Sequence, residues 1–468
     1  MTYPFRKVRY IIVLVLFLSA MLPAQNPVPF LTQPLIPDAI APAPPGLIFA
    51  LTVNGTGFVP GATVNWNGSP RFTRFVSASR LIAFIVSSDI SVPTTAWITV
   101  ANPGPGGGVS NVLFLPVHNP ASKLAFQRTD YLVGHQTQFA ATADFRGNRI
   151  LDLAVATTTE MISIFLGNGD GTFQPQTDYD AGPCPVIPVI GDFNRDGILD
   201  LAVPLRCPWE GGVSVLLGRG DGTFQSPIQY AAGYGPAHGL TADFNGDGKL
   251  DLAVLNNLSE DVSILLGNGD GSFQPPMDFG VGQNPIVVAA GDFDGDGKLD
   301  LVVSNYNSRT ASVLLGNGDG TFRPRVDYAV GLCPAGVAVA DFNGDEKLDL
   351  VVASECEPWV FVLLGNGDGT FRPPMRYAHS RYGAFCVEIA DFNADGKLDL
   401  GVSTFEPALD ILLGNGDGAF ERRYGFPVGE DAWSAVPADF NRDGLMDAAT
   451  SSYTTNSISV LVSQPAAP

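Results

Sequence analysis

One acidic segment recurs seven times along the chain at nearly constant spacing. Its clearest copy is DFDGDGKLDL, and the copies begin at Asp144, Asp192, Asp243, Asp292, Asp341, Asp391 and Asp439, in steps of 48, 51, 49, 49, 50 and 48 residues. A repeat of this length is one supersecondary unit, and its apolar faces need neighbouring copies to cover them. The repeat therefore dictates the architecture of most of the chain.

Each repeat contains four segments with strand patterns and none with the period of a helix. In residues 273–322 they are the proline-bearing, edge-like FQPPMDFGVG, the apolar run PIVVAAGDF, the alternating KLDLVVSNY, and ASVLLG before the turn GNGDGTF. Four antiparallel strands per unit predict a propeller blade. We expect the apolar second segment to lie innermost, with both of its faces against adjacent blades.

The two ends of the array predict that the ring of blades closes. The chain enters the array with FQRTDY at Phe126, which matches the edge segment FQPQTDY at Phe173, and leaves it with Ser457–Val462, after which no edge segment follows. The first strand would complete the last blade, and the capping repeats that an open solenoid needs are absent from the sequence. The predicted fold class is all-β, with a seven-bladed β-propeller over residues 124–463.

The acidic segment, the GNGDGTF turn and the period together resemble the FG-GAP or VCBS repeat family, the integrin-alpha-like propellers, over about residues 122–463. Separately, VNGTGFVPGATVNWNG at residues 53–68 and ITVANPGPGGGVSN at residues 98–111 resemble an IPT/TIG-type immunoglobulin-like domain. Short alternating strands between Gly/Pro turns also favour a small β-sandwich there. We expect this domain over residues 27–117 and a linker over residues 118–123.

The acidic segment has the pattern of a site for a hard divalent cation. In DFNGDGKLD, side-chain oxygens occupy positions 1, 3, 5 and 9, position 6 is a glycine where the backbone turns sharply, and position 7 offers its carbonyl. Many flexible oxygen ligands favour Ca²⁺ over Mg²⁺, and the family resemblance implies the same ion. Asp, Asn and Gly also dominate ordinary turns, but five copies hold the four oxygen positions while position 4 varies.

Five copies keep every ligand and the glycine, and we expect all five to bind Ca²⁺. Their predicted ligands are Asp192, Asn194, Asp196, Ile198 and Asp200; Asp243, Asn245, Asp247, Lys249 and Asp251; Asp292, Asp294, Asp296, Lys298 and Asp300; Asp391, Asn393, Asp395, Lys397 and Asp399; and Asp439, Asn441, Asp443, Leu445 and Asp447. The residue at position 7 would contribute its backbone carbonyl.

Two copies depart from the pattern. One keeps the ligands but has Glu346 where the glycine belongs, which predicts a strained backbone or a weaker ion, so this sixth site is doubtful. Its ligands would be Asp341, Asn343, Asp345, Lys347 and Asp349. The first copy has Arg146 and Arg149 in the loop, and we expect it to hold no cation.

The GNGDGTF-type turns at Gly167, Gly218, Gly267, Gly316, Gly365 and Gly414 need no ligand to explain them. Their glycines suffice for a tight hairpin. We interpret them as plain hairpin turns.

The cysteine positions follow the repeat. Cys184 and Cys207 lie 8 residues before and 15 after Asp192, and Cys333 and Cys356 have the same spacing about Asp341. If the acidic loop joins two antiparallel strands, each pair meets at the far end of one hairpin, so we predict two disulfides. Cys386 is left over and is interpreted as a buried free thiol.

The first 24 residues have the pattern of a secretory signal: three cations, the apolar run Ile11–Leu18 and a small-residue exit. The run is too short to span a membrane comfortably, no later stretch is long enough, and no lipid-accepting cysteine follows. We expect a secreted or cell-envelope protein, with an uncleaved anchor as the alternative. The net charge of −21 argues against nucleic acid as a partner.

The sequence favours recognition over catalysis. It has no HExxH, no GxSxG elbow and no metal-spaced histidine pair. The loops opposite the acidic segments differ between repeats and carry aromatic residues, a pattern typical of a binding surface on a rigid scaffold. These aromatic residues are Trp209, Trp359, Tyr234, Tyr306, Tyr382, Trp433 and Tyr453. We expect a non-enzymatic recognition or adhesion protein for an extracellular protein or glycan, and the alternative is a glycan lyase or hydrolase.

Overall fold

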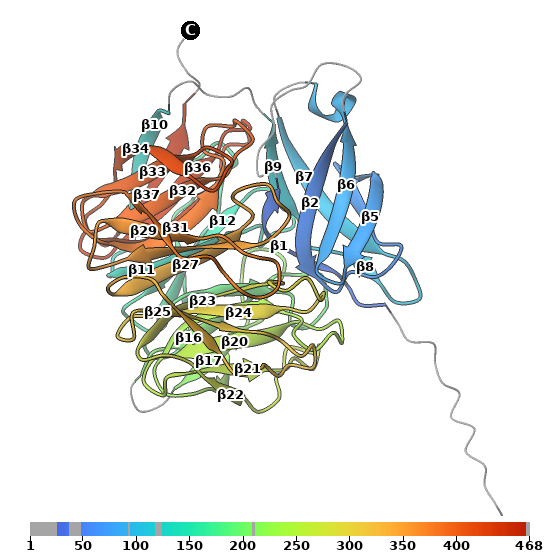
Figure 1. Ribbon diagram of the computed structural model, residues 1–468, viewed down its shortest axis with the longest axis horizontal. Coiled ribbons are helices and arrows are strands. Elements are labelled where there is room, and N and C mark those ends of the chain that lie inside the picture. The colour runs from blue at the N-terminus through green and yellow to red at the C-terminus, as the bar shows by residue number, and fades with distance from the viewer. Residues whose placement is uncertain (1–25, 37–47, 92–93, 118–123, 208–210, 465–468) are drawn as a thin grey trace, which may run out of the picture.

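The computed structural model describes residues 26–36, 48–91, 94–117, 124–207 and 211–464, and they fold almost entirely into β-strands (Figure 1). The described helical structure is one short 3₁₀ turn, η1 (Ser87–Ile90). No helix within these ranges is long and apolar enough to cross a bilayer. The all-β prediction is therefore confirmed. The predicted signal peptide, the predicted linker and Trp209 lie outside the described residues.

Residues 26–117 form two sheets around a shared core, and we call this part the N-terminal sandwich. One sheet has the order β1 (Phe30–Ile36), β2 (Ile48–Thr56), β6 (Arg80–Val86), β5 (Phe72–Ser77). The other has the order β4 (Ser69–Pro70), β3 (Thr63–Trp66), β7 (Thr94–Asn102), β8 (Gly108–Val109), with β9 (Leu113–Val117) also paired to β7. Buried side chains from both sheets, such as Leu51 and Ile98, meet in one cluster. Two apolar faces buried against each other hold the sandwich together.

The rest of the chain forms seven four-stranded antiparallel sheets, consistent with the blades of a propeller. From inner to outer strand they are: blade 1, β11 (Thr137–Ala143), β12 (Asp152–Thr157), β13 (Met161–Phe165), β14 (Thr177–Asp180); blade 2, β15 (Val189–Gly191), β16 (Asp200–Leu205), β17 (Gly212–Leu216), β18 (Ile228–Ala231); blade 3, β19 (Pro236–Ala242), β20 (Asp251–Asn256), β21 (Asp261–Leu265), β22 (Met277–Gly280); blade 4, β23 (Pro285–Gly291), β24 (Asp300–Asn305), β25 (Thr310–Leu314), β26 (Val326–Ala329); blade 5, β27 (Pro334–Ala340), β28 (Asp349–Ser354), β29 (Trp359–Leu363), β30 (Met375–Ala378); blade 6, β31 (Ala384–Ala390), β32 (Asp399–Thr404), β33 (Ala408–Gly414), β34 (Phe420–Pro427); and blade 7, β35 (Ala432–Ala438), β36 (Asp447–Ser452), β37 (Ser457–Ser463), β10 (Phe126–Leu132).

The ring closes as the sequence predicts. Strand β10, the first of the array, pairs along its whole length with β37, the last, from Phe126 opposite Ser463 to Leu132 opposite Ser457. The inner strands of neighbouring blades contact one another, and β35 contacts β11. The two ends of the array are thus joined by the backbone hydrogen bonds of one sheet.

The apolar second segment of each repeat is the inner strand, as expected, and in blade 4 it contacts the inner strands of both neighbouring blades. It is not the most deeply buried strand. In blade 4, two residues of intermediate exposure separate each pair of buried residues of the inner strand β23, whereas the next strand, β24, is buried at every position. Several of the intermediate residues, such as Val287, line an axial cavity. Clusters between blades, such as Leu255 and Val262 with Val303, supply the burial that holds neighbours together.

The cysteine predictions are met in part. Cys333 and Cys356 form a disulfide, with Cα atoms 5.5 Å apart. The sulfur atoms of Cys184 and Cys207 lie 2.8 Å apart as thiols, so the spacing is right and the bond itself stays a prediction. Cys386 is unbridged, as predicted, and it is partly rather than fully buried because it lines the axial cavity.

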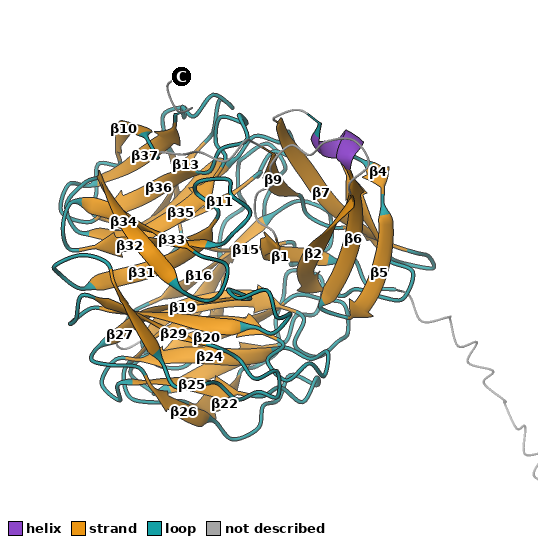
Figure 2. Cartoon of the chain, turned by 45° about the horizontal axis from the view of Figure 1, so that its top comes forward, coloured by secondary structure: helices purple, strands orange, loops and turns teal. Residues whose placement is uncertain are grey.

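The N-terminal sandwich lies against the ring of blades, with β1 and β9 on the side that faces the ring (Figures 1 and 2). Its residues touch the acidic loops of several blades. A Cβ placed on Gly248 would meet Pro27, and one placed on Gly444 would meet the carbonyl of Val117. The sandwich therefore covers the end of the ring that carries the acidic loops.

Candidate metal centre

Each acidic loop joins the inner strand of a blade to the second strand, and its own side chains fold it. In blade 3, the carboxylate of Asp243 accepts hydrogen bonds from the amides of Gly246, Asp247 and Gly248 at 2.8, 3.1 and 2.8 Å. The Asn245 side chain accepts the amide of Asp247 at 2.9 Å. Such Asx-type bonds replace ladder bonds where the strand has ended. They gather the side chains of positions 1, 3 and 5 in one tight loop.

Position 6 of the loop requires a left-handed backbone. Its φ is +76° at Gly248 and +83° at Gly297, and it is +65° at Glu346 and +66° at Arg149, where the residue carries a side chain. The expectation that Glu346 is strained is thus confirmed, because a residue with a Cβ pays for this conformation. Position 4 is left-handed as well, at Arg195 for example (φ +62°), a requirement that the sequence analysis missed.

The aspartate at position 9 clamps two parts of its blade. In blade 2, Asp200 is fully buried and accepts the amide of Phe193 from the acidic loop at 2.9 Å and the amide of Gly218 from the GNGDG-type turn at 2.8 Å. Equivalent pairs of bonds recur in the other blades. This carboxylate therefore fixes the position of the turn relative to the loop.

Burial makes the ionised form of this aspartate costly. It raises the pKa of Asp200, Asp251, Asp300 and Asp349 to about 7, because desolvation outweighs the two amide hydrogen bonds and nearby carboxylates repel the charge. In blades 6 and 7 the pKa of the equivalent aspartate is raised well above its usual value for the same reason. A cation among these oxygens would offset both effects.

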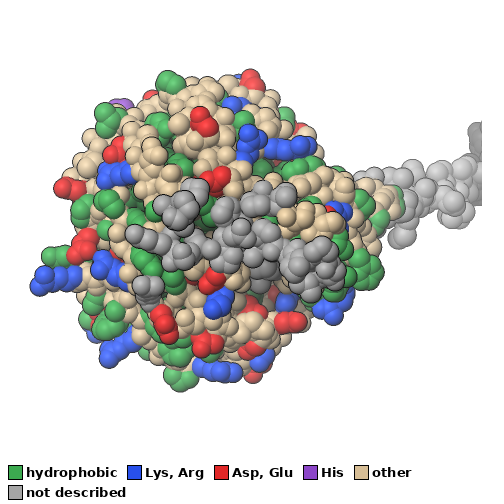
Figure 3. All heavy atoms as spheres, turned by 90° about the horizontal axis from the view of Figure 1, so that it is seen from above, with side chains coloured by type: hydrophobic (Ala, Val, Ile, Leu, Met, Phe, Trp, Pro, Cys, Tyr) green, Lys and Arg blue, Asp and Glu red, His purple; other side chains and the backbone are tan. Residues whose placement is uncertain are grey.

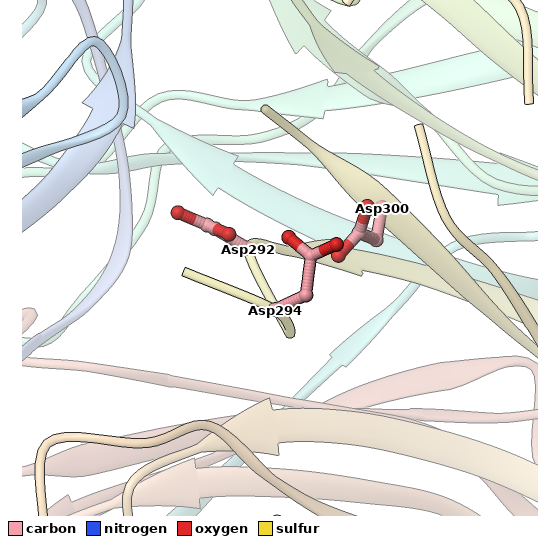
Figure 4. Close-up of side chains that lie close together, drawn as sticks. All are labelled: Asp292, Asp294 and Asp300. Carbon is pink, nitrogen blue, oxygen red and sulfur yellow. The ribbon is translucent and has the colours of Figure 1, made fainter. Parts of the chain in front are cut away.

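In blade 4 the carboxylates converge most closely. Asp292, Asp294 and Asp300 each offer an oxygen within 4.8 Å of the other two, and Figure 4 shows Asp294 lying between its neighbours. The other loops predicted to bind have Asn at position 3, so an amide oxygen takes the place of that carboxylate. An oxygen-only donor set of this kind fits a hard cation such as Ca²⁺.

In blade 1, an arginine side chain supplies the positive charge beside the buried position 9 aspartate. The Arg146 guanidinium, at position 3, lies 2.6 Å from Asp152 Oδ1 and 2.7 Å from the carbonyl oxygen of Gly167. Burial raises the pKa of Asp152, and the hydrogen bond from Arg146 opposes that rise. A fixed positive charge thus lies beside the position 9 carboxylate, and the absence of a metal ion from this loop stays a prediction.

The interpretation of the GNGDGTF segments as plain hairpin turns was incomplete. In blade 3, the amide of Gly271 donates to the carbonyl of Phe193 in the acidic loop of blade 2 at 3.0 Å, and the ring of Phe273 packs on that of Phe193. The same bond links blades 1 and 7 and blades 4 to 6 with their predecessors. These five turns therefore join the acidic loops of neighbouring blades, a role that only the contact between repeats could show.

The two residues that replace the position 6 glycine both contact the N-terminal sandwich. Arg80 donates to the carbonyl of Glu346 at 3.0 Å and lies 3.9 Å from its carboxylate, and the Arg149 guanidinium stacks over the Trp97 ring at 4.2 Å. The Thr95 hydroxyl also hydrogen-bonds the carboxylate of Asp439. The sandwich and the acidic loops thus form one interface.

The residues present fit the implied Ca²⁺ ion. The loops of blades 2, 3, 4, 6 and 7 offer oxygens at positions 1, 3, 5 and 9. Among the described residues, their position 9 aspartates have no ion pair like that of Asp152 with Arg146. Burial, and to a smaller extent repulsion by nearby carboxylates, raises the pKa of Asp300 and its equivalents. When bound, the ion would supply positive charge to a buried carboxylate cluster. The protein supplies the folded loop and the position 9 clamp. The predicted ligand sets, including the carbonyls at position 7, remain predictions.

Comparison with known proteins bears on the family and the fold. No curated protein matches the chain. A putative 6-phosphogluconolactonase from Bacteroides uniformis is 14% identical, with a TM-score of 0.50, over 69% of this chain and 91% of that one. A putative phosphatase from Bacteroides thetaiotaomicron is 12% identical, with a TM-score of 0.41, over 93% of this chain and 97% of that one. An auxiliary nutrient binding protein from Bacteroides ovatus is 11% identical, with a TM-score of 0.38, over 93% of this chain and 98% of that one. At such identities a likeness bears on the fold alone.

A family model described as FG-GAP-like repeat matches residues 144–203, 206–254, 243–303, 292–352, 341–402 and 391–450. These matches cover more than half of the chain and fall on the blades. They do not reach the N-terminal sandwich, whose resemblance to an IPT/TIG-type domain stays a prediction. The chain therefore belongs to the FG-GAP-like repeat family of β-propellers.

Proposed function

We propose that this is an exported, calcium-stabilised recognition protein that binds an extracellular protein or glycan through one face of its propeller. We call this the open face: the end of the ring formed by the loops between the second and third strands of the blades. It lies opposite the acidic loops, because each second strand begins at an acidic loop and ends at the open face. Among the described residues, the sandwich contacts the acidic-loop end of the ring, which supports the opposite end as the place for a partner.

The open face carries the variation between repeats. Its loops read NNLSED in blade 3, YNSR in blade 4, ECEP in blade 5 and FEP in blade 6, whereas the acidic loops are nearly uniform. Loops on a rigid scaffold tolerate such variation without loss of the fold, which is why binding residues concentrate there.

One observation carries the proposal: a cluster of aromatic side chains at the open face. Trp433 and Tyr453 of blade 7 stack with ring centroids 4.8 Å apart, and Phe385 of blade 6 lies 5.3 Å from Trp433 and 4.2 Å from Phe405. Phe405 is 37% exposed. Partly exposed aromatic groups supply large contact areas at little entropic cost, and they anchor protein and glycan ligands.

Of the other aromatic residues predicted for this face, some are exposed and one packs against the core of the propeller. Tyr234 and Tyr382 are 62% and 54% exposed and could contact a partner. Trp359 instead packs partly against the core between blades 4 and 5, with the Arg376 guanidinium 5.0 Å from its ring. This placement favours a structural role for Trp359.

The distribution of charge supports a partner other than a polyanion. Where Figure 3 draws described residues, basic and acidic side chains are scattered among uncharged ones and form no patch of a single sign. Polyanion binding depends on clustered Lys and Arg, because it proceeds by counterion release. A net charge of −21 works against it further.

We propose that the protein is not an enzyme, and the glycan lyase or hydrolase is kept as the alternative. Hydrolysis of a glycosidic bond normally needs two facing carboxyl groups. Of the described residues that line the axial cavity away from the acidic loops, one is a carboxylic acid, Glu388. A single carboxyl group supports binding better than hydrolysis.

The test is a glycan and surface-protein array, run with Ca²⁺ and with EDTA, followed by variants against any ligand found. Replacing both Trp433 and Phe405 with Ala should weaken binding by at least about tenfold, as expected for aromatic anchors. Phe72→Ala removes an aromatic ring that is 77% exposed on the sandwich, and it should leave binding unchanged. A ligand that ignores the double variant while the fold is intact would contradict the proposal.

A further inference from the structure

The inner strands of the seven blades enclose an axial cavity of about 750 Å³. This volume is in the range of pockets that hold small molecules. At the acidic-loop end, sandwich residues of the segments 28–31 and 109–114 line it. Towards the open face it is bordered by Phe139 and Phe385, whose rings lie 6.3 and 5.3 Å from that of Trp433. The cavity thus meets the sandwich at one end and the aromatic cluster at the other.

The walls of the cavity are mostly apolar. Three residues before each acidic loop, the inner strands contribute a ring of seven side chains in which Glu388 stands among Ala, Val and Leu residues. Five residues before each loop, a second ring nearer the open face has three polar members: His238, Cys386 and Ser434. Neither ring contains a Lys or an Arg.

The carboxyl group of Glu388 has no fixed positive partner in this wall. Its described hydrogen bond comes from the Cys386 thiol, with Sγ 3.1 Å from Oε1. Within the described part of the chain, Nδ1 of His238 makes no hydrogen bond although it is inaccessible to solvent. A carboxyl group in an apolar enclosure without a counter-charge is costly to keep unless a ligand compensates it.

We propose that the axial cavity binds a small organic cation, an amine on an apolar body, with Glu388 as its counter-charge. An ammonium group would pair with the carboxylate while the apolar walls cover the rest of the molecule. The aromatic cluster at the open face favours entry of a cation over that of an anion.

The environment of Glu388 agrees with this assignment. Burial raises the pKa of Glu388 to about 7, only partly opposed by the hydrogen bond from Cys386. A bound ammonium group would lower it again, so ligand and carboxylate would stabilise each other. The inference does not rest on the proposed function, since the cavity lies behind the open face and needs no macromolecular partner.

The test uses Cys386 as a reporter inside the cavity. The purified chain is treated with cationic 2-aminoethyl methanethiosulfonate or with neutral methyl methanethiosulfonate, and mass spectrometry follows modification of the Cys386 peptide. Relative to their rates with free cysteine, the cationic reagent should be favoured by about tenfold, the equivalent of about 1.4 kcal/mol. Glu388→Gln should remove this preference. Glu421→Gln, the same change at an exposed position on the outer strand β34 of that blade, should retain it.

A second measurement on the unchanged protein keeps the test independent of the folding of the variants. Added 2-phenylethylamine should slow modification of Cys386 more than its uncharged counterpart 2-phenylethanol does. Equal protection by both would replace the amine with a neutral apolar ligand and overturn the proposal. Equal rates for the two reagents, or no modification by either, would overturn it as well.

Discussion

The acidic loops of blade 1 and blade 4 have nearly the same backbone and solve one electrostatic problem in two ways. In both, the position 9 aspartate accepts one amide from the loop and one from the turn: Asp152 at 3.3 and 2.8 Å, Asp300 at 2.8 and 2.7 Å. In blade 1 the Arg146 guanidinium lies against that aspartate. In blade 4, Lys298 and Arg323 pair with Asp294 and Asp296 at the exposed side of the loop.

The comparison of these two loops indicates what every acidic loop of the repeat requires. The loop tolerates either a guanidinium that belongs to the chain or, as we propose, a dissociable Ca²⁺ ion, because the common requirement is positive charge beside a buried carboxylate. Blade 1 should therefore be indifferent to Ca²⁺, and the blades that keep the full ligand set should depend on it.

The largest effect expected is that of removing Ca²⁺ altogether. With about 1 mM ion and affinities typical of extracellular modules, each site contributes about 0.4–1.4 kcal/mol, and five sites about 2–7 kcal/mol. EDTA should lower the melting temperature substantially, measured by circular dichroism, and added Ca²⁺ but not Mg²⁺ should restore it. A melting temperature that EDTA leaves unchanged would contradict the proposal that Ca²⁺ stabilises the other blades as Arg146 stabilises blade 1.

Replacing the internal cation should cost less than losing five ions but more than an ordinary surface change. Arg146→Met leaves the fully buried Asp152 without its partner and should destabilise the fold by about 3 kcal/mol, read from urea unfolding. Ca²⁺ should not rescue this variant, since Met at position 3 offers no oxygen ligand.

The matched variant brings blade 1 close to the pattern of the other blades. Arg146→Asn combined with Arg149→Gly introduces an oxygen at position 3 and a glycine at position 6, while Asn148 still offers an amide oxygen at position 5. Its stability should be low in EDTA and should recover in Ca²⁺, giving a larger response to Ca²⁺ than the unchanged chain. If Ca²⁺ leaves the double variant as unstable as Arg146→Met, the two loops are not equivalent solutions.

The response to pH should differ with and without Ca²⁺. The pKa of Asp300 and its equivalents is raised to about 7 in the folded chain, so the folded state favours their protonated form. Without Ca²⁺, that contribution to stability is fully present below pH about 4 and is lost as pH rises through about 7. Ca²⁺ needs the ionised form, so its stabilising effect should grow across the same window. A gain in melting temperature from Ca²⁺ that is constant from pH 4.5 to 7.5 would contradict this.

The smallest effect concerns Glu346. Glu346→Gly removes a side chain from a left-handed position, which favours the fold by about 1 kcal/mol. It also removes the ion pair with Arg80 at 3.9 Å, whose contribution is about 0–1 kcal/mol. We expect slight stabilisation and tighter binding of Ca²⁺, measured by calorimetry. Asn343→Gly changes the loop without relieving that backbone and should weaken binding instead.

Much of the fold followed from the sequence because its cues are local and repeated. Seven acidic segments gave the number of blades, and the unmatched edge segment at Phe126 gave the closure with β37. Cysteines in one phase of the repeat gave the disulfide between Cys333 and Cys356. The special conformation at position 6 was visible from the glycine alone.

Other features escaped because they depend on contacts between distant residues. The turn at Gly271 looked like a simple hairpin until its bond to Phe193 placed it between two blades. Arginine at position 3 predicted an empty loop, but only the folded chain shows that Arg146 satisfies Asp152. The axial ring containing Glu388 is assembled from seven strands, and no single repeat reveals it.

The sequence by itself determined a closed ring of seven similar sheets and the oxygen-rich loop in each, because spacing and residue type within about 50 residues suffice for both. Tertiary structure decided which end of the ring remains open, because that depends on the sandwich reaching across the chain, as Arg80 does to Glu346, 266 residues away. Local propensity is encoded in neighbouring residues, whereas surface complementarity between separate domains exists only once both have folded.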